Sequence, residues 1–552
     1  MGIFDFGITS IPTLIMKFVF IRSSRVRSAP VNRASIYLTT AAGLAMCFAL
    51  SAATAGTETP PKTPNILLIL ADDLGYGDVA CYNPESKVPT PRIDQLAREG
   101  LRFTDAHSPA TVCTPTRYSI LTGRMAFRTG FRSVFTGVGG PCLIEAERLT
   151  LPGMLRNHGY TTALSGKWHV GMTFYDSEGE PIHDNGLEAV ERVDFSRPVS
   201  DGPIHRGFDH FFGTVSCPTT DWLYAYMDGD RIPVPPTGLI DKSKLPDHHY
   251  ALDCREGLIA PGFDLEEVDE VFLDYSIGLL TKHVAEKPEQ PFFLFHSCQA
   301  VHLPSFPAPE FQGKTEAGPH GDFIFQFDAI VGRLLDKLDE LGVADDTLVI
   351  VTSDNGPELP TVQHMRDIFH HDGAHPWRGV KRDNWEGGHR VPLIVRWPGV
   401  VEPGSETAQT VSLADLMATV ADFIGHDLPE NAAEDSLSIL PVLDGRLAET
   451  ESLRRYTLQE SIRGFSLRDG PWKYLDHQGS GGNNYEVEGH WGAKSFALPD
   501  SAPEAPAQLY HLDRDPGERE NLYFEHPEIV ERMEKELERM KSSGRSTPWP
   551  RP

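Results

Sequence analysis

Carboxylates and an amide that follow two apolar runs of the sequence offer hard oxygen ligands for a metal ion. Asp72 and Asp73 come directly after one run, and Asp354 and Asn355 come shortly after another. Oxygen ligands without a thiolate or an imidazole suit calcium or magnesium better than zinc. Each pair alone is typical of a turn or a helix cap. Two such pairs, each after an apolar run, favour a metal site.

A cysteine motif adds a reactive position to these oxygen ligands. Cys113 opens the segment CTPTR, in which Pro115 is suited to the first turn of a helix and Arg117 follows. Cys113 would then lie at the amino end of a helix, where the dipole favours an anion. For a lone cysteine, a buried structural role is the simpler interpretation. The complete pattern of Cys113, Pro115 and Arg117 favours a functional one.

A lysine and two histidines follow two further apolar runs. Lys167 and His169 lie in the segment GKWH after Thr161–Ser165, and His302 comes six residues after Pro291–His296. Lysine binds anions, and histidine is the most common general acid or base. His296, at the end of its own run, is an alternative to His302.

The apolar runs themselves predict buried parallel strands with helices between them. A stripe of apolar residues over 327–341, ended by Gly342, predicts the clearest helix. This alternation predicts an α/β sheet with helices on both faces. Because sites in open α/β sheets lie beyond the carboxyl ends of strands, we expect the polar residues above to meet at one edge. The predicted strands are Asn65–Ala71, Thr161–Ser165, Pro291–His296, Thr347–Thr352 and Val391–Trp397.

The carboxyl-terminal part has a different pattern. Alternation over Arg455–His477, with a turn at Asp469-Gly470-Pro471, predicts a hairpin, and an apolar stripe from Val530 to Met540 predicts a terminal helix. We expect five segments: a signal peptide with a basic extension (1–55), a linker (56–63), a catalytic domain (64–429), a small α+β subdomain (430–541) and a tail (542–552).

Composition excludes several classes of protein. The 552 residues are 40% hydrophobic and 23% charged, which is ordinary for a globular protein and excludes a disordered chain or a polytopic membrane protein. The formal net charge of −28 argues against nonspecific nucleic-acid binding, which needs a basic face.

The amino terminus has the three parts of a secretory signal. Basic residues precede the apolar run 37–50, and an Ala-x-Ala pattern at 53–55 follows it, so we expect cleavage after Ala55 and export to the periplasm or the exterior. The run is too short for a stable membrane span. An uncleaved anchor is the alternative.

Five ordered motifs over residues 64–525 resemble those of the type I sulfatases, the arylsulfatase family of the alkaline-phosphatase-like superfamily. They are Asp72-Asp73, CTPTR with its continuation YSILTGR, GKWH, Ser353-Asp354-Asn355-Gly356, and Lys381 ahead of WEGG. Thr116 stands where serine is more common in the family. The resemblance implies a large mixed, mostly parallel sheet sandwiched by helices, with a smaller carboxyl-terminal subdomain of antiparallel sheet plus helix.

The resemblance also implies the cofactors. A formylglycine-generating enzyme would oxidise Cys113 to Cα-formylglycine, whose hydrate attacks sulfur with one hydroxyl and expels sulfate when the other is deprotonated. One calcium ion, rather than magnesium, would be held by Asp72, Asp73, Asp354, Asn355 and the modified Cys113.

The roles of the remaining site residues follow from the same motifs. Arg117 and Lys167 would orient the hydrate and offset the charge of the sulfate. His169 would be the base for the second hydroxyl. His302 and Lys381 would bind sulfate and stabilise or protonate the leaving oxygen.

The sequence therefore predicts an exported, calcium-dependent sulfuric ester hydrolase that acts on sulfated carbohydrates or aryl sulfates. A phosphoester or phosphonate monoester hydrolase on the same fold is one alternative. A non-catalytic module that binds sulfated glycans is another, if Cys113 stays unmodified.

Overall fold

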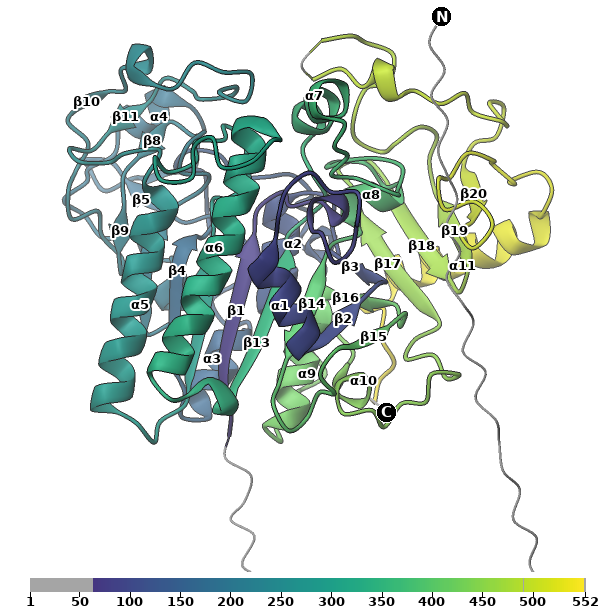
Figure 1. Ribbon diagram of the computed structural model, residues 1–552, viewed down its shortest axis with the longest axis horizontal. Helices are drawn as coiled ribbons and strands as arrows, with labels where there is room; N and C mark the ends of the chain where they lie inside the picture. Colours follow the sequence, from purple (N-terminus) through teal and green to yellow (C-terminus); the bar gives the residue numbers. More distant parts are fainter. Residues whose placement is uncertain (1–62, 490, 551–552) are drawn as a thin grey trace, which may run out of the picture. The chain divides into compact units, whose positions relative to one another are not determined.

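Nine strands form the central sheet of the computed structural model, which describes residues 63–489 and 491–550 (Figure 1). The predicted signal peptide lies outside these residues. Five of the eight strand pairs are parallel and three are antiparallel. In spatial order the strands are β15 (Ser405–Thr407), β2 (Leu101–Phe103), β14 (Leu393–Arg396), β13 (Thr347–Ser353), β1 (Asn65–Ala71), β12 (Phe292–Ser297), β4 (Thr161–Lys167), β7 (His210–Thr214) and β9 (Met227–Asp228).

Strand β1 lies in the middle and sets the register of the site. It runs parallel to β13 on one side, with Ala71 beside Ser353, and parallel to β12 on the other, with Ile69 beside His296. Strand β4 continues the parallel part, with Gly166 beside Ser297. The carboxyl ends of these four strands therefore reach one edge of the sheet.

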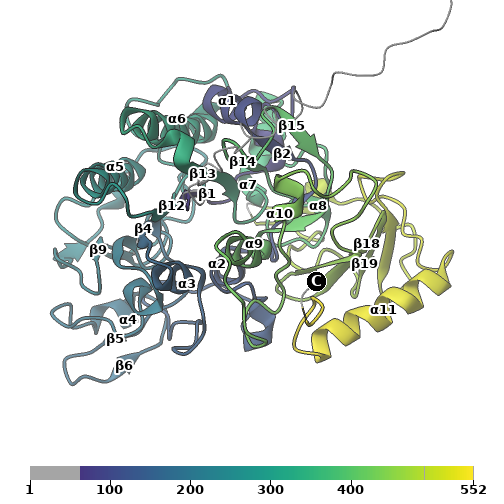
Figure 2. The same ribbon diagram turned by 90° about the horizontal axis from the view of Figure 1, so that it is seen from below.

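Helices cover both faces of the sheet because the residues of β1 that point to one face and those that point to the other are all apolar. Leu67 and Ile69 pack in a core with α1, α5 and α6, whereas Ile66 and Leu68 pack in a core with α2, α3 and α9. Figure 2 shows the two groups of helices on opposite sides of the strands. The helices are α1 (Pro91–Glu99), α2 (Cys113–Thr122), α3 (Leu151–Asn157), α4 (Leu187–Glu191), α5 (Val268–Glu286), α6 (Gly318–Glu340), α7 (Leu359–Phe369), α8 (Glu386–His389), α9 (Leu416–Phe423), α10 (Leu440–Leu443) and α11 (Pro527–Ser542).

The predicted direction of one strand was wrong. Strand β14, expected to be parallel like the others, runs antiparallel to β13. The chain that leaves β13 forms α7 and α8 and then enters β14 without crossing back to the other end of the sheet. A buried apolar run shows that a strand has two covered faces, but it carries no information about direction.

A second, antiparallel sheet and the last helix form the carboxyl-terminal part. The turn predicted at Gly470 joins β18 to β19. Helix α11 packs Val530, Met533 and Leu537 against this sheet, and Figure 2 shows the helix beside β18 and β19. The predicted fold class, a large mixed sheet with helices and a smaller antiparallel sheet, is therefore confirmed. The strands of this second sheet are β17 (Tyr456–Glu460), β18 (Phe465–Asp469), β19 (Trp472–Leu475) and β20 (Gln508–His511).

Three small sheets shape the loops of the larger unit. The one that matters for the site has three strands in the order β10, β11, β8. Their bounds are Gly238–Leu239, Leu258–Ile259 and Leu223–Tyr224, and the two other small sheets pair β16 (Val411–Ser412) with β3 (Ala106–His107) and β5 (Phe174–Tyr175) with β6 (Pro181–Ile182).

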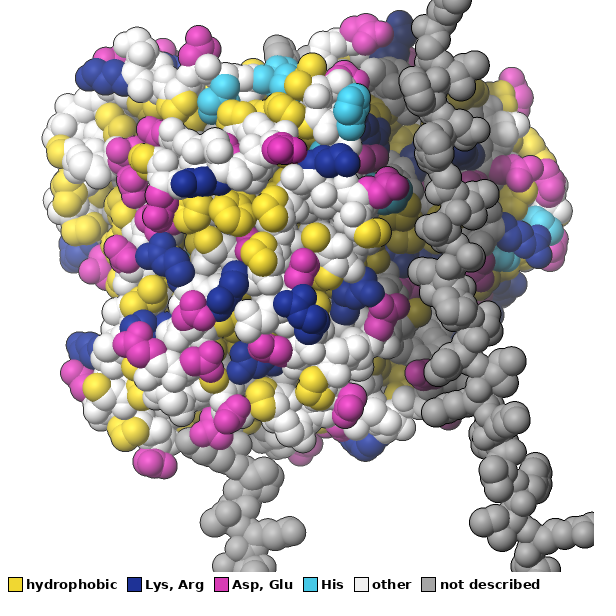
Figure 3. All heavy atoms as spheres, in the orientation of Figure 1, with side chains coloured by type: hydrophobic (Ala, Val, Ile, Leu, Met, Phe, Trp, Pro, Cys, Tyr) yellow, Lys and Arg dark blue, Asp and Glu magenta, His cyan; other side chains and the backbone are white. Residues whose placement is uncertain are grey.

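The charged surface is mixed on the face that Figure 3 draws, where acidic and basic side chains are interspersed. No helix within residues 63–489 and 491–550 has both the length and the apolar character needed to cross a bilayer.

Candidate active site

Three carboxylates and one amide meet beyond the carboxyl ends of β1 and β13. The Asp73 amide donates a hydrogen bond to Asp354 Oδ1 at 3.3 Å, and Asn355 Nδ2 donates to Asp73 Oδ1 at 2.7 Å. With Asp72, all four side chains are fully buried. Asn355 Oδ1 is also buried and has no hydrogen-bond partner among the described residues, so its lone pairs are available to a ligand.

Cys113 lies against this group at the first residue of α2. Its Sγ is 3.4 Å from Asp72 Oδ1, and ligand atoms of Asp72, Asp73, Cys113 and His302 all lie within 4.8 Å of one another. Burial raises the pKa of the Cys113 thiol well above its ordinary value, and Asp354 and Asp72 raise it further. The unmodified thiol is therefore held protonated and is a poor nucleophile.

Three cations are paired with the three acids. Lys167 Nζ contacts Asp72 Oδ2. Lys381 Nζ lies 2.7 Å from Asp73 Oδ2, and Arg117 Nη2 lies 2.9 Å from Asp354 Oδ2. These six side chains form the catalytic cluster: Asp72, Asp73, Asp354, Arg117, Lys167 and Lys381. It is charge-balanced and buried.

The acids of this cluster are not equally stabilised. Burial would raise the pKa of Asp72, but Lys167 and its other charged neighbours hold it well below its ordinary value. Burial raises the pKa of Asp73 to about 6 and that of Asp354 to about 7 despite their cationic partners. Without a further cation, these two carboxylates are costly to keep ionised.

The donor set fits a hard divalent cation. It consists of carboxylate oxygens and one amide oxygen that lacks a partner, and two of the carboxylates are incompletely neutralised by the protein. Calcium and magnesium prefer such oxygen ligands. The predicted metal-ligating residues Asp72, Asp73, Asp354 and Asn355 are therefore brought together, with Cys113 beside them.

The His169 carbonyl accepts a hydrogen bond at 2.8 Å from the hydroxyl of Thr114, the residue after Cys113, and the His169 backbone has an unusual conformation, with φ of 56°. Its Nε2 donates to the Phe135 carbonyl at 2.6 Å, because a carbonyl oxygen can only accept. Nδ1 is then the unprotonated nitrogen, and it is buried with no partner among the residues that the structure describes. Burial, together with Lys167 and Arg117, lowers the pKa of His169, so the ring is neutral and its Nδ1 can accept a proton.

His302, rather than the alternative His296, faces the cluster. His302 Nε2 is 3.7 Å from Asp73 Oδ2, and its Nδ1 donates to the Leu303 carbonyl. Burial lowers the pKa of His302 to about 3. His296 Nδ1 instead lies 2.9 Å from the Ser276 hydroxyl on α5, inside the protein.

A pocket of about 370 Å³ opens onto these residues. Cys113, His169, His302 and Lys381 line its inner part. The acids and Arg117 lie behind them. Several other residues that line this catalytic pocket were not predicted from the sequence: Cys217, Asp221, Asp253, Arg255, Glu358, Arg382 and Trp491.

Glu358 is one of these residues and contacts the cluster directly. Its Oε2 is 3.6 Å from Lys381 Nζ, and both its oxygens accept from the Arg382 guanidinium. Burial would raise the pKa of Glu358, but Arg382 and Lys381 lower it to about 2. Its position before the Leu-Pro start of α7 is a recognisable cap signal, but nothing in the sequence indicates its partners.

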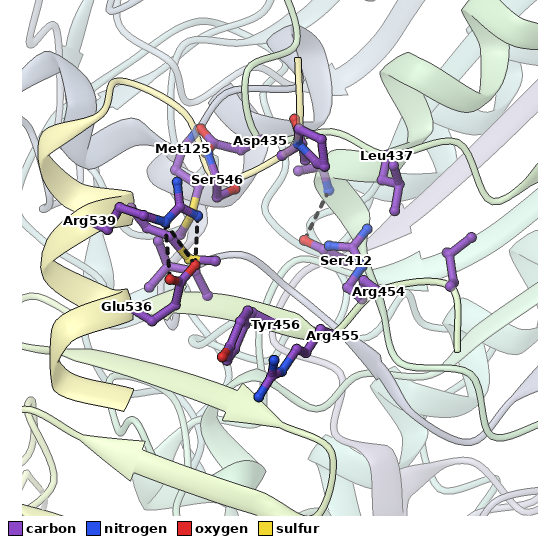
Figure 4. Close-up of a pocket in the computed structure, with 16 residues that line it drawn as sticks. Met125, Ser412, Asp435, Leu437, Arg454, Arg455, Tyr456, Glu536, Arg539 and Ser546 are labelled. Atoms are coloured by element: carbon purple, nitrogen blue, oxygen red, sulfur yellow. Dashed lines mark hydrogen bonds and ion pairs between the residues drawn. The ribbon is translucent and has the colours of Figure 1, made fainter. Parts of the chain in front are cut away.

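Another cavity, of about 460 Å³, lies between α11, β17 and the loops before β17 (Figure 4). Its arginines are already paired with acids. Arg539 contacts Glu536, as the dashed lines in Figure 4 show, and Arg454 contacts Asp415. This second cavity therefore offers no uncompensated arginine for an anionic ligand among the residues that Figure 4 labels.

Comparison with known proteins gives consistent matches over this region. Residues 64–426 match the family model described as Sulfatase. An N-acetylgalactosamine-6-O-sulfatase of Bacteroides thetaiotaomicron is 32% identical over 499 residues, covering 87% of this chain and 94% of the relative. Human arylsulfatase A is 32% identical over 507 residues, covering 88% and 86%.

Solved structures agree with the sequence matches. A structure from work on the metabolism of multiple glycosaminoglycans by Bacteroides thetaiotaomicron has a TM-score of 0.72 and 28% identity, covering 87% of this chain and 100% of that chain. A phosphonate monoester hydrolase of Agrobacterium radiobacter, with a TM-score of 0.55 and 19% identity over 87% of this chain and 96% of its own, shares the fold.

Proposed function

The chain belongs to the sulfatase family, and on this premise we propose that it releases sulfate from sulfated carbohydrates by means of Cys113, matured to Cα-formylglycine, and one calcium ion. The predicted family and enzyme class, a sulfuric ester hydrolase, are confirmed. A carbohydrate substrate is supported by the relatives named N-acetylgalactosamine-6-sulfatases, from Bacteroides thetaiotaomicron, pig and dog.

Asp72, Asp73, Asp354 and Asn355 would hold the calcium ion. Bound there, the ion supplies Lewis acidity to the sulfate ester and to the attacking oxygen. The proposal is supported by the unpartnered Asn355 Oδ1 and by the incomplete neutralisation of Asp73 and Asp354.

Position 113 would supply the nucleophile. The thiol is protonated and buried, so an oxygen nucleophile made by a formylglycine-generating enzyme suits the position better than sulfur. The aldehyde hydrate offers one hydroxyl for attack and a second whose deprotonation expels the sulfate. His169 Nδ1 is the acceptor for the proton of that second hydroxyl.

The cations of the site would bind the sulfate group and compensate its negative charge. Arg117 and Lys167, held by Asp354 and Asp72, orient residue 113 and offset the negative charge that develops during transfer. Lys381 and His302 line the pocket. Lys381 would bind the sulfate group, and His302 would bind it and stabilise the leaving oxygen in the protonated form, in which Nε2 donates as well as Nδ1. Lys381 uses one N–H on Asp73 and keeps others for the substrate.

The observation that carries this proposal is the contact of Cys113, at the start of α2, with Asp72 in a cluster of oxygen ligands. The test is the release of inorganic sulfate from N-acetylgalactosamine 6-sulfate and from 4-nitrophenyl sulfate by protein from its native host. Cys113→Ala should remove turnover while the circular dichroism spectrum stays unchanged. Retained turnover in that variant would refute the assignment of residue 113 as the nucleophile.

The shared fold makes a phosphonate or phosphate ester hydrolase the rival. Turnover of 4-nitrophenyl sulfate and 4-nitrophenyl phosphate, which have the same leaving group, separates the two. We expect a higher kcat/KM for the sulfate ester. Mass spectrometry of the peptide that contains residue 113 should show an aldehyde, and a thiol there would support a non-catalytic glycan binder.

A further inference from the structure

We propose that Asp221, Asp253 and Arg255, here called the acidic wall, select a sugar that carries no anionic group other than the sulfate to be removed. The wall would hydrogen-bond the hydroxyls of that sugar and repel a second sulfate or a carboxylate. This inference rests on the proposed function and concerns the substrate class of the same pocket.

Arg255 is held from three sides. Its Nη1 contacts Asp221 Oδ1, its Nη2 lies 3.4 Å from Asp253 Oδ1, and its guanidinium lies 4.7 Å from the centre of the Trp222 ring. Asp221 is buried, whereas the side chains of Arg255 and Asp253 remain 30% and 27% exposed. A ligand therefore meets Asp253 and Arg255, and Asp221 positions the arginine.

The backbone of the wall is fixed as well. The Arg255 amide donates to the Thr220 carbonyl at 3.2 Å, and the Tyr224 hydroxyl donates to the Arg255 carbonyl at 2.6 Å. Strands β8 and β11 pair directly beyond these residues. Asp253 has a φ of 67°, a conformation that non-glycine residues adopt only where the surroundings hold it. The wall is thus preorganised for a ligand.

The wall begins next to the catalytic residues. The Cys217 amide donates to Asp221 Oδ2 at 3.3 Å, and Cys217 Sγ is 3.7 Å from His302 Nε2. Ligand atoms of His169, Cys217 and Asp221 lie within 4.8 Å of one another. A sugar whose sulfate reaches His302 and Lys381 therefore extends along the wall, in a pocket whose 370 Å³ lies at the small end of the range for ligand sites.

The charges of the side chains that line the pocket determine which sugar can bind. The two acids and one arginine of the wall sum to −1. Across the pocket, Arg382 is paired with Glu358, and its Nε donates to Asn483 Oδ1 at 2.9 Å. Lys381 is the other cation that lines the pocket, and it would bind the sulfate that is removed. Hydroxyls can donate to Asp253 and accept from Arg255, whereas a second anion would face an unbalanced carboxylate.

Binding to the Cys113→Ala protein tests the wall without requiring turnover. Calorimetry should show that N-acetylgalactosamine 6-sulfate binds at least tenfold more tightly than N-acetylgalactosamine 4,6-disulfate. Asp253→Asn is nearly isosteric, and the side chain is partly exposed. This change should lower the affinity for the monosulfate about tenfold and reduce the ratio between the affinities for the two sugars. Arg255→Gln should also weaken the monosulfate. Asp241→Asn, an exposed acid outside the pocket, is the matched control and should change neither value.

Equal affinity for the two sugars, or an Asp253→Asn protein that binds both as the parent does, would overturn the proposal. In the enzyme with Cys113 intact, Asp253→Asn should lower kcat/KM about tenfold for the sugar and less than twofold for 4-nitrophenyl sulfate, which has no hydroxyls. An equal loss on both substrates would also contradict it. Failure of the proposed function looks different, because the parent enzyme would then release sulfate from neither substrate while the binding preference could still be measured.

Discussion

Two buried clusters in this protein contain the same numbers of charges and are built for different purposes. The catalytic cluster has three acids and three cations. The second, here called the junction cluster, lies between the large unit and the carboxyl-terminal sheet and consists of Asp105, Glu386, Glu518, Arg390, Arg468 and Lys473.

The six members of the junction cluster are buried and form ion pairs with one another. Lys473 on β19 lies 3.0 Å from Glu386 Oε1 on α8 and 2.9 Å from Glu518 Oε1. Arg390 bridges Asp105 and Glu386 at 2.9 and 2.6 Å. None of its six described members lines the catalytic pocket.

What separates the two clusters is their access to a pocket. The catalytic cluster lies behind Cys113 and Lys381, which line a pocket, and the unpartnered Asn355 Oδ1 lies beside it, whereas none of the six members of the junction cluster lines that pocket. Charge composition alone therefore does not identify an active site. Removing a charge should abolish chemistry in the first cluster and weaken the fold in the second.

The largest effect is expected for Asp354→Asn. This change removes one predicted metal ligand and the partner of Arg117, so kcat/KM should fall about a thousandfold or more. Bound calcium, measured by atomic emission on the purified protein, should fall in parallel. Glu518→Gln serves as the control from the junction cluster and should retain calcium. An Asp354→Asn protein with full calcium content would contradict the ligand role.

Lys473→Met tests the other half of the comparison. It leaves Glu386 and Glu518 without their shared cation in a buried site, which should lower the free energy of unfolding by about 3–5 kcal/mol. Urea titration followed by fluorescence measures this loss. The folded fraction should still bind calcium. A stability equal to that of the parent would show that the junction cluster is not structural.

The double variant Lys473→Met/Glu518→Gln tests whether the contact between Lys473 and Glu518 accounts for part of that loss in the free energy of unfolding. Because Lys473 is the cation that contacts Glu518, neutralising both should cost about 1–3 kcal/mol less than the sum of the single changes. The same titration measures the coupling. Simple additivity would mean that the two side chains do not interact energetically.

The smallest effect is a pH dependence at Glu518. Burial raises its pKa to about 7, so the native state holds a proton more readily than the unfolded chain. This contribution to stability is complete below the unfolded pKa and is lost as the pH rises through about 7. Relative to Glu518→Gln, the parent should therefore lose about 1–3 kcal/mol between pH 5 and pH 8. A difference that stays constant over this range, measured by urea titration at each pH, would contradict it.

The large sheet was predictable because its signals are local. The run Asn65–Ala71 matches β1 in full, and strands of this kind deliver their next residues to a known edge. Asp72, Asp354 and Lys167 were therefore predicted to meet without knowledge of any contact. Pairing of β1 with both β12 and β13 places them within one cluster.

The acidic wall, the junction cluster and the direction of β14 depend on contacts that sequence patterns do not encode. Arg255 reaches Asp221 through a loop whose shape is set by the short pairing of β8 and β11. Lys473 alternates with apolar neighbours as an exposed strand residue would, but the large unit covers it and supplies Glu386. The antiparallel direction of β14 likewise follows from the path of the preceding chain.

The depth of Cys113 limits when its proposed modification could take place. The residue is 1% exposed and is enclosed by groups that follow β1 and β13, yet it precedes Asp354 by nearly half of the chain. If an enzyme modifies position 113 as proposed, it should act before β13 docks, because docking leaves the residue almost fully buried. Conditions that accelerate closure of the sheet should thus leave more molecules permanently unprocessed.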